Sequence, residues 1–287
     1  MAELTKAVIE EWVRGTDGWW DIAQLDRDLN LDPSAATKSK RRVILHRLVS
    51  EGILKRHPDQ NGKFKLVTAD ATIVDWRNAD VSNTIDIMLP FGLEQWVTIY
   101  PKNLILIAGA PNSGKSAICL NIVALNMNRP NLDNLKPIEY FTSEMGPEEL
   151  KLRLSKFPAM EWNFVARERN SGFADVIKPD KINIIDYLEV TDNFYMVADE
   201  LNEIFTTLTT GIAIVALQKK IGARLGRGAE FSLEKPRLYL SLDNNRLTIE
   251  KGKNWAQPGV NPNGKKWTFK LVDGWHFCNI KEVHDGA

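Results

Sequence analysis

Residues 103–116 read NLILIAGAPNSGKS, and this stretch decides the fold of the chain. The run up to residue 108 is apolar after Asn103 and has the length of a buried strand, while residues 117–127 follow a helical period. Between them, Gly109–Ser116 has the spacing G-x-x-x-x-G-K-[ST]. The glycines let backbone N–H groups close around phosphate oxygens, and the helix start adds partial positive charge. The stretch therefore predicts a nucleoside triphosphate site at a strand–loop–helix turn.

The residues of this phosphate-binding loop have separate expected roles. Lys115 is expected to reach the β- and γ-phosphates, and the Ser116 hydroxyl is expected to ligate Mg²⁺. The expected substrate is ATP and the expected cofactor is Mg²⁺. The predicted nucleotide-binding residues are Gly109, Ala110, Pro111, Asn112, Ser113, Gly114, Lys115, Ser116 and Ala117.

Three further runs, at residues 138–145, 182–189 and 211–217, are expected to be strands beside the first one. Each has a polar residue at or near its end: Glu144 in the first, Asp186 in the second, and Gln218 directly after the third. Because the carboxyl ends of parallel strands meet at one edge, such residues face the ligand. The pattern predicts an α/β fold with a central, mostly parallel sheet.

The motifs on these strands resemble those of one ATPase family. In order, the chain carries Ser143-Glu144-Met145 with Leu150 and Arg153, then Asp186-Tyr187-Leu188, Leu217-Gln218 and Lys251-Gly252-Lys253-Asn254. Over roughly residues 88–278, their order and spacing resemble the RecA-like ATPases, most closely the DnaB-type (RepA-like) hexameric replicative helicases. We expect no counterpart of the family's usual N-terminal helical domain in residues 1–87.

The resemblance implies a role for each motif. Glu144 would polarise the water that attacks the γ-phosphate, and Asp186 would hold Mg²⁺ opposite Ser116. Gln218 would sense the γ-phosphate. Lys253, where the family has arginine, would be the finger that reaches a neighbouring subunit's γ-phosphate, with Lys251 as its partner cation. A lysine lacks the planar fork of arginine, and a finger given in trans implies a ring or filament.

Residues 219–228 are rich in glycine and basic side chains and have no period, which predicts a loop. In RecA-like proteins the loop at this place grips single-stranded DNA. The basic residues expected to contact it are Lys219, Lys220, Arg224 and Arg227. A grip made of charge would tolerate any sequence and weaken with salt.

The charge of the first 66 residues is unevenly spread. Residues 1–37 have 3 basic and 8 acidic residues, and residues 38–66 have 9 basic and 2 acidic, although Lys+Arg and Asp+Glu are both 37 over the chain. The overall balance excludes a globally basic nucleic-acid coat but allows local basic faces. Three expected helices, the third starting at Asp32-Pro33, precede a hairpin turning at Asn61-Gly62.

This order of elements resembles a small α+β winged-helix module. The resemblance implies that the third helix enters the major groove and the hairpin contacts phosphates. The residues placed to do so are Lys38, Lys40, Arg41, Lys63 and Lys65. The alternative is a module that docks a protein and has a solvated basic face, so the expected partner is double-stranded DNA or a protein.

The predicted organisation is a winged-helix-like domain at 1–67, a connector at 68–98 and a RecA-like ATPase domain at 99–287. In the connector, residues 89–93 and 96–101 are expected to form a short hairpin. No apolar run is long enough to span a membrane, and the N-terminus does not resemble a signal peptide. Two cysteines far apart favour a reducing, cytoplasmic setting.

Three hypotheses follow for the function. The first is an ATP-driven hexameric ring that moves on single-stranded DNA. The second is a RecA-like recombinase, or an accessory or loader ATPase, that binds DNA without unwinding it. The third is a winged-helix DNA-binding adaptor whose nucleotide site only switches its oligomeric state.

Overall fold

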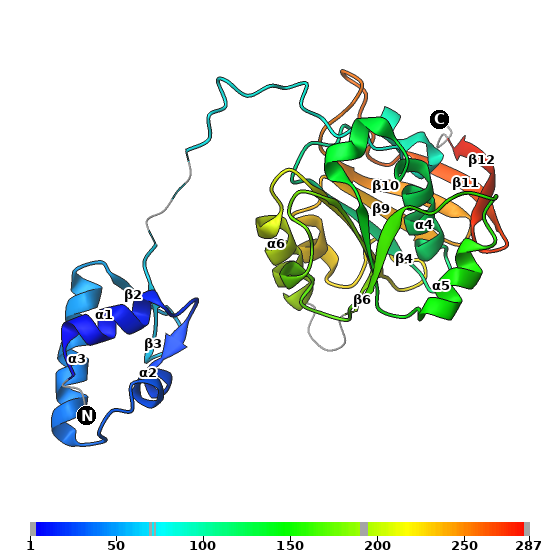
Figure 1. Ribbon diagram of the computed structural model, residues 1–287. Coiled ribbons are helices and arrows are strands. Elements are labelled where there is room, and N and C mark those ends of the chain that lie inside the picture. Colours follow the sequence, from blue (N-terminus) through cyan, green and yellow to red (C-terminus); the bar gives the residue numbers. More distant parts are fainter. Residues whose placement is uncertain (1–3, 69–70, 72, 190–194, 284–287) are drawn as a thin grey trace. The chain divides into compact units, whose positions relative to one another are not determined.

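The computed structural model describes residues 4–68, 71, 73–189 and 195–283 (Figure 1). The chain divides into two compact units, Met1–Ala79 and Asp80–Ala287. The boundary differs from the predicted connector, because Ile85, Leu89 and Leu93 are buried in the core of the larger unit. No helix in the described part of the chain is both long and apolar enough to cross a lipid bilayer.

The smaller unit contains three helices and a three-stranded antiparallel sheet of order β1-β3-β2. Its elements are α1 (Lys6–Arg14), β1 (Trp20–Asp21), α2 (Ile22–Asp28), α3 (Ala35–Ser50), β2 (Leu54–Arg56) and β3 (Lys63–Leu66). The predicted helices and hairpin are present, with the two-residue strand β1 in addition. The cap of α3 differs from the expected Asp32: Ser34 Oγ accepts the Thr37 N–H at 3.3 Å.

A single apolar cluster holds the smaller unit together. Trp20 is 1% exposed and stacks on Phe64 of β3 at a centroid distance of 5.4 Å, so β1 fixes the hairpin against the helices. Leu45 and Leu48, which lie three residues apart on α3, face the same cluster. The basic residues of α3 are therefore left on its remaining surface.

The larger unit is built on a nine-stranded sheet of order β12-β11-β10-β9-β4-β8-β7-β5-β6. The strands from β9 to β6 are parallel, and β10, β11 and β12 continue the sheet as antiparallel hairpins. The strands are β4 (Leu104–Gly109), β5 (Ile138–Thr142), β6 (Phe164–Glu168), β7 (Ile182–Leu188), β8 (Ile212–Gln218), β9 (Leu238–Asp243), β10 (Arg246–Gly252), β11 (Lys266–Val272) and β12 (His276–Val283).

Helices cover both faces of this sheet (Figure 1). Alternate residues of β4 face opposite ways: Ile105 and Ile107 pack with α4, whereas Leu104 and Leu106 pack with α6. The helices are α4 (Lys115–Asn126), α5 (Pro147–Leu154) and α6 (Tyr195–Thr207), with 3-10 turns η1 (Pro90–Gln95), η2 (Pro130–Leu135), η3 (Phe173–Asp175) and η4 (Ala229–Leu233). The result is an α/β fold with a mostly parallel central sheet, as predicted.

Two details of the larger unit differ from the sequence analysis. The expected hairpin of residues 89–101 is absent, since residues 90–95 form η1 and Val97 bridges to Trp255. The edge strand β6 is not anticipated, because Arg167 and Glu168 interrupt its short apolar start. After the parallel strands, the chain forms the antiparallel pairs β9–β10 and β11–β12.

Candidate nucleotide site and nucleic-acid surfaces

The phosphate-binding loop lies at the carboxyl end of β4 and leads directly into α4. Gly109 has no room for a side chain, because a Cβ there would lie 2.4 Å from Lys115 Cγ. Gly114 has φ +99° at the N-cap of α4, a left-handed conformation that favours glycine. Ser113 Oγ donates to the Ala110 carbonyl at 2.7 Å and closes the turn. The loop therefore has the tight backbone that phosphate cradling requires.

Lys115 is held inside this loop. Its Nζ donates to the carbonyls of Gly109 at 3.3 Å and Ala110 at 3.2 Å. Burial lowers the pKa of Lys115, and the negative charges of Asp186 and Glu144 oppose that shift. Both carboxylates predicted for the site therefore act electrostatically on the predicted phosphate-binding lysine.

Asp186 lies on β7, buried at the same edge of the sheet. Its side chain hydrogen-bonds to the Ser116 hydroxyl, and Tyr140 on β5 donates its hydroxyl to Asp186 Oδ2 at 2.5 Å. Burial raises the pKa of Asp186, and these two hydrogen bonds together with the charge of Lys115 lower it. Tyr140 is buried beside the carboxylate and lies outside the predicted set of site residues.

The side chains at this point fit Mg²⁺. A serine hydroxyl and a carboxylate are the hard oxygen donors that Mg²⁺ takes, and it usually keeps substrate phosphates and waters as its other ligands. The described residues contain no group of three or more His, Cys, Asp or Glu side chains that could form an all-protein metal site. Ser116 and Asp186 therefore suit an ion that the nucleotide helps to hold.

Glu144 lies just beyond β5 and is exposed. It hydrogen-bonds to the side chain of Tyr187, which follows Asp186 on β7. Burial raises the pKa of Tyr187, and the negative charge of Glu144 raises it further. The Tyr187 ring lies 5.8 Å from Lys115 Nζ. Tyr187 therefore connects the predicted water-activating residue to the phosphate-binding lysine.

Gln218 ends β8 directly beside the loop. Its register partner on β4 is Gly109, and the next residue, Lys219, donates its backbone N–H to the Gly109 carbonyl at 3.0 Å. The Gln218 carbonyl accepts the Arg227 N–H at 2.8 Å, which closes the loop of residues 219–227 back on the strand. Gln218 thus joins the phosphate-binding loop to the basic loop.

Lys219 differs from the DNA-contacting role predicted for it. It is 2% exposed, and its Nζ donates to Ala223 O at 2.6 Å, Ser241 Oγ at 2.9 Å and Asp243 Oδ2 at 2.8 Å. A buried ammonium with three acceptors is a structural anchor and has no donor left for DNA. Lys220 and Arg224 are exposed on the same loop, Arg224 with an ion pair to Glu250 at 3.1 Å.

Lys251 and Lys253 lie near the amino-terminal ends of the parallel strands β4 and β9, whereas the phosphate-binding loop follows the carboxyl end of β4. Gly252 pairs with Leu238 on β9, and Leu238 pairs with Ile105 near the start of β4. Lys251 Nζ donates to the main-chain carbonyls of Leu233 and Glu234, so this lysine is engaged within its own chain. Lys253 is exposed.

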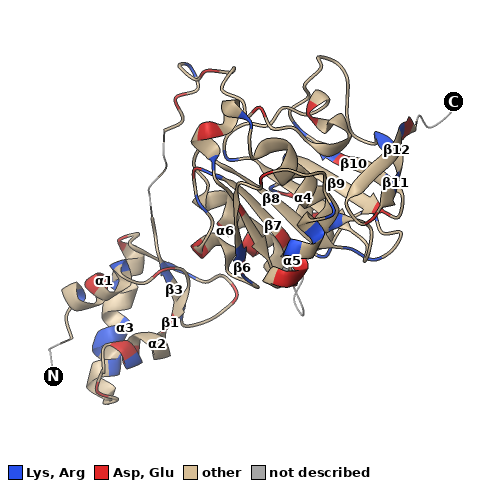
Figure 2. Cartoon of the chain, turned by 45° about the vertical axis from the view of Figure 1, so that its right-hand side comes forward, with Lys and Arg blue, Asp and Glu red and all other residues tan. Residues whose placement is uncertain are grey.

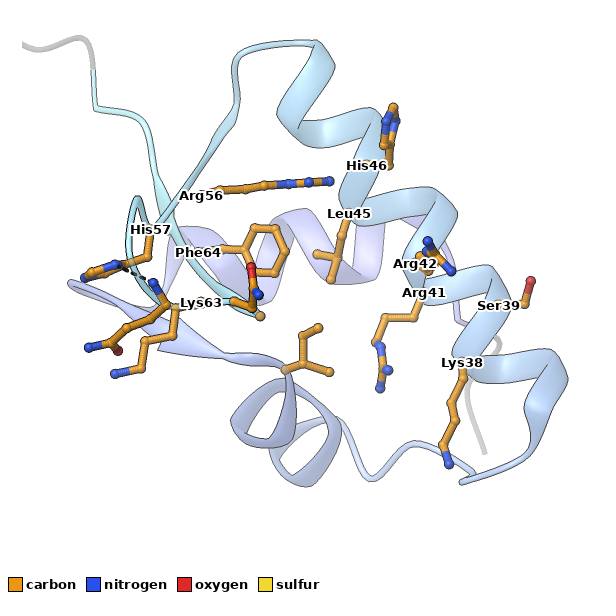
Figure 3. A pocket seen from close by; sticks show the side chains of 14 residues that line it. Lys38, Ser39, Arg41, Arg42, Leu45, His46, Arg56, His57, Lys63 and Phe64 are labelled. Carbon is orange, nitrogen blue, oxygen red and sulfur yellow. Dashed lines mark hydrogen bonds between the residues drawn. The ribbon is translucent and has the colours of Figure 1, made fainter.

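In the smaller unit, α3 and the β2–β3 hairpin enclose a groove of about 480 Å³ (Figure 3). Its basic lining consists of Lys38, Arg41, Arg42, Arg56 and Lys63, with His46 and His57. Its apolar lining is Ile22, Leu45 and Phe64, and no Asp or Glu is among the described residues that line it. The cationic side of α3 is visible in Figure 2.

Only part of the predicted DNA-contacting set lines this groove. Lys38 and Lys63 do so, and Arg41 does so while paired with Asp26. Lys40 lies in a different hollow beside Thr5, and Lys65 lies over the Trp19 ring at 5.0 Å. Arg42 and Arg56 also line the groove and lie outside the predicted set. The i, i+4 spacing of Lys38 and Arg42 is the signal that identifies one helix face.

Comparison with solved structures supports the fold of the larger unit. The chain is similar to a KaiC-like protein from the hyperthermophilic archaeon Pyrococcus horikoshii OT3, with 13% sequence identity and a TM-score of 0.52. The match covers 69% of this chain and 98% of that chain. No protein-family model and no curated protein matches the sequence. At this identity the likeness concerns the fold alone, and it supports the predicted RecA-like α/β core.

Proposed function

We propose that the chain is an ATP-hydrolysing motor that acts on single-stranded DNA as an oligomeric ring, like the hexameric DnaB-type helicases that its motifs resemble. The observation that carries the proposal is the gathering of Lys115, Ser116, Asp186 and Glu144 at one edge of the sheet. These four residues come from three separate segments of the chain. Their chemistry is that of phosphoryl transfer from a nucleoside triphosphate to water.

In the proposed reaction, a water oxygen bonds to the γ-phosphorus of ATP while the bond from that phosphorus to the bridging β–γ oxygen breaks. Glu144 accepts the proton of the water, and ADP and inorganic phosphate leave. Lys115 offsets the negative charge of the transferring group. Ser116 and Asp186 would hold Mg²⁺, which neutralises phosphate charge when bound. The hydrogen bond from Tyr187 orients the Glu144 carboxylate.

We propose that the loop of residues 219–227 makes the contact with single-stranded DNA. Lys220, Arg224 and Arg227 supply the charge, and the exposed side chain of Ile221, at 83% exposure, supplies an apolar surface for bases. Gln218 and the buried Lys219 connect this loop to the phosphate-binding loop and to β9. Loss of the γ-phosphate from the phosphate-binding loop would therefore change the position of the loop of residues 219–227.

One experiment tests the main proposal. The ATPase rate is measured with and without single-stranded DNA, and the size of the protein with ATP is measured by light scattering in the same sample. We expect a ring-sized species and a rate that DNA increases several-fold. A monomeric protein whose ATPase ignores DNA would contradict the proposal. A strand-displacement assay beside a filament assay then separates a helicase from a recombinase or loader.

The adaptor hypothesis is separated from both by one substitution. Glu144→Gln removes the proton acceptor and keeps the size of the side chain. Under the adaptor hypothesis, nucleotide binding only switches the oligomeric state, and ATP hydrolysis is not needed. The variant should then assemble with ATP and bind DNA as the wild type does, and it should keep the function of the protein. If turnover drives the protein, the variant binds ATP and is inactive.

A second proposal concerns the smaller unit: its groove binds the phosphates of double-stranded DNA. The groove brings five basic side chains together without a lining carboxylate, and Lys38, Arg42 and Lys63 have no ion pair among the described residues. Exposed cations that converge on one concave surface favour a polyanion over an ordinary protein surface. This observation favours DNA over a protein partner.

The groove is tested with a fluorescent DNA duplex and the triple variant Lys38→Ala, Arg42→Ala and Lys63→Ala. We expect weaker binding and a slope of log K against log salt that is smaller by about 1 for each lost phosphate contact. Arg14→Ala, an exposed arginine on α1, is the matched control. A triple variant with the affinity and salt slope of the control would favour protein docking.

A further inference from the structure

Arg237 and Lys253 lie opposite each other, one residue before β9 begins and one residue after β10 ends. The antiparallel register of β9 and β10 pairs Tyr239 with Lys251 and Leu238 with Gly252. The next pair along is Arg237 with Lys253, and the Lys253 N–H donates to the Arg237 carbonyl at 3.0 Å. Two like charges opposite each other at the end of a strand pair repel each other. An anion bound between Arg237 and Lys253 would offset this repulsion.

No acidic group of the described chain satisfies this pair. Arg237 is exposed, and the structure shows no ion pair or side-chain hydrogen bond for it in the described residues. Lys253 is exposed and likewise has none there. Lys251, by contrast, donates to two main-chain carbonyls, and the charges of Lys253 and Arg237 add to burial in lowering its pKa. Two of the three cations are therefore free to bind an anion.

The anion cannot be the nucleotide bound by the same chain. Leu238 pairs with Ile105 and Leu242 pairs with Gly109, so Arg237 lies five residues from the level of the phosphate-binding loop. At about 3.3 Å per residue this is about 16 Å along the strand. The Arg237 guanidinium is thus at the far edge of the sheet, where a neighbouring copy of the chain can meet it.

We propose that Arg237 supplies the guanidinium that completes the ATP site of a neighbouring subunit, beside Lys253. The inference rests on the proposed function and deepens it. The resemblance implies a trans-acting finger at position 253, where this chain has lysine. Arg237 presents, one strand away, the planar fork that binds phosphate oxygens through two hydrogen bonds and that Lys253 lacks.

The first test compares Arg237→Ala, Arg237→Lys and the surface control Lys281→Ala, which removes an exposed cation from β12. We expect Arg237→Ala to lower kcat at least about tenfold, since a finger contributes through the transition state. Affinity for a fluorescent ATP analogue, oligomer size and melting temperature should be unchanged. Arg237→Lys keeps the charge without the fork, so its kcat should stay closer to that of the alanine variant.

The second test asks whether Arg237 acts in trans. Copies with Glu144→Gln carry an intact Arg237 and a site that does not turn over, whereas copies with Arg237→Ala carry an intact Glu144. Each is inactive or slow alone, and mixed oligomers should regain activity, because one copy gives its arginine to the complete site of the other. An arginine that acts on its own chain's site predicts no gain on mixing.

The outcomes separate this inference from the proposed function. If the wild-type chain does not hydrolyse ATP, the proposed function fails and the inference fails with it. If the wild type hydrolyses ATP and Arg237→Ala has the kcat of Lys281→Ala, only the inference is overturned. The same holds if Arg237→Ala is slow but mixed oligomers regain nothing.

Discussion

Tyr140 donates its hydroxyl to Asp186 across the adjacent strands β5 and β7, and both side chains are buried at the edge of the sheet that carries the phosphate-binding loop. The contact fixes one oxygen of the carboxylate, while the Ser116 hydroxyl bonds to the same side chain. Asp186 is thereby held in one orientation by two hydrogen bonds.

Tyr140→Phe should therefore weaken the use of Mg²⁺. Loss of a hydrogen-bonding partner behind a metal ligand costs about 10–100-fold in metal affinity or activity. We expect the Mg²⁺ concentration for half-maximal ATPase to rise, with the fold unchanged because the ring is kept. The measurement is an ATPase titration with Mg²⁺. Tyr100→Phe removes a hydroxyl elsewhere in the larger unit and serves as control, and a Mg²⁺ curve shared by both variants and the wild type would contradict the assigned role.

Glu144→Gln should stop turnover while leaving ATP bound. Removal of a general base costs roughly 100-fold or more in rate. The amide keeps a hydrogen-bonding oxygen for Tyr187, so the local structure should persist. Single-turnover ATP hydrolysis and binding of a fluorescent ATP analogue measure the two effects separately.

Glu148→Gln is the matched control for this change, because Glu148 is an exposed carboxylate in the first turn of α5. It should hydrolyse ATP at the wild-type rate. Equal rates for both variants would show that Glu144 does not activate the water.

Lys219→Met should destabilise the larger unit. Because Lys219 is buried, the substitution removes no direct contact with DNA. The variant leaves Asp243 without its ammonium partner, and one Asp243 oxygen already has no hydrogen bond. The free energy of unfolding should fall by about 2 kcal/mol, below the ~3–5 kcal/mol of a fully buried pair, because the Asp243 side chain is 36% exposed.

Urea unfolding of the single variants and of Lys219→Met with Asp243→Asn measures the coupling between the two residues. The double variant should lose less than the sum of the single changes. Lys220→Ala, one residue along and exposed, should weaken binding of single-stranded DNA and leave stability unchanged. Additive losses in the double variant would show that the pair contributes nothing to stability.

Gly114→Ala should impair the phosphate-binding loop for two separable reasons. A Cβ would lie 2.9 Å from a Leu271 methyl on β11, and the φ of +99° is costly for alanine by about 1–2 kcal/mol. Adding Leu271→Ala removes the close contact and leaves the φ cost. We therefore expect the double variant to recover part of the stability but not the affinity for a fluorescent ATP analogue.

The control for the backbone effect is Gly264→Ala. Gly264 has φ +86° and nothing within 4 Å of a built Cβ, so it carries the conformational cost without a close contact. Its melting temperature should fall slightly and its nucleotide affinity should stay at the wild-type value. A Gly114→Ala variant that resembles this control in both measurements would contradict the account of the loop.

The features that the sequence predicts correctly are those that depend on residues close together in the chain. The spacing from Gly109 to Ser116 and the apolar runs that become β4, β5, β7 and β8 identify the sheet and its functional edge. Asp186 could be placed beside Ser116 for the same reason: both follow from the ends of parallel strands.

Partners distant in sequence could not be predicted in this way. Counting charges selects Lys219 and Arg41 as DNA contacts, but the acids that pair with them, Asp243 and Asp26, are brought close only by the fold. Likewise, the hydrogen bond from Tyr140 to Asp186 depends on the pairing of β5 with β7, which no local pattern around Tyr140 indicates. Local competition explains the cap of α3, where Asp32 bonds to the Ser34 N–H and Ser34 caps the helix.

The distance between the two ends of β9 has a consequence for dilution. Arg237 and Lys253 lie beyond one end of the strand, and the predicted phosphate-binding loop lies beyond the other. If Arg237 completes the ATP site of a neighbouring copy, as proposed, the specific activity will depend on the protein concentration. The rate per subunit would fall on dilution at saturating ATP, and the midpoint of that fall would report the dissociation constant of the contact between copies.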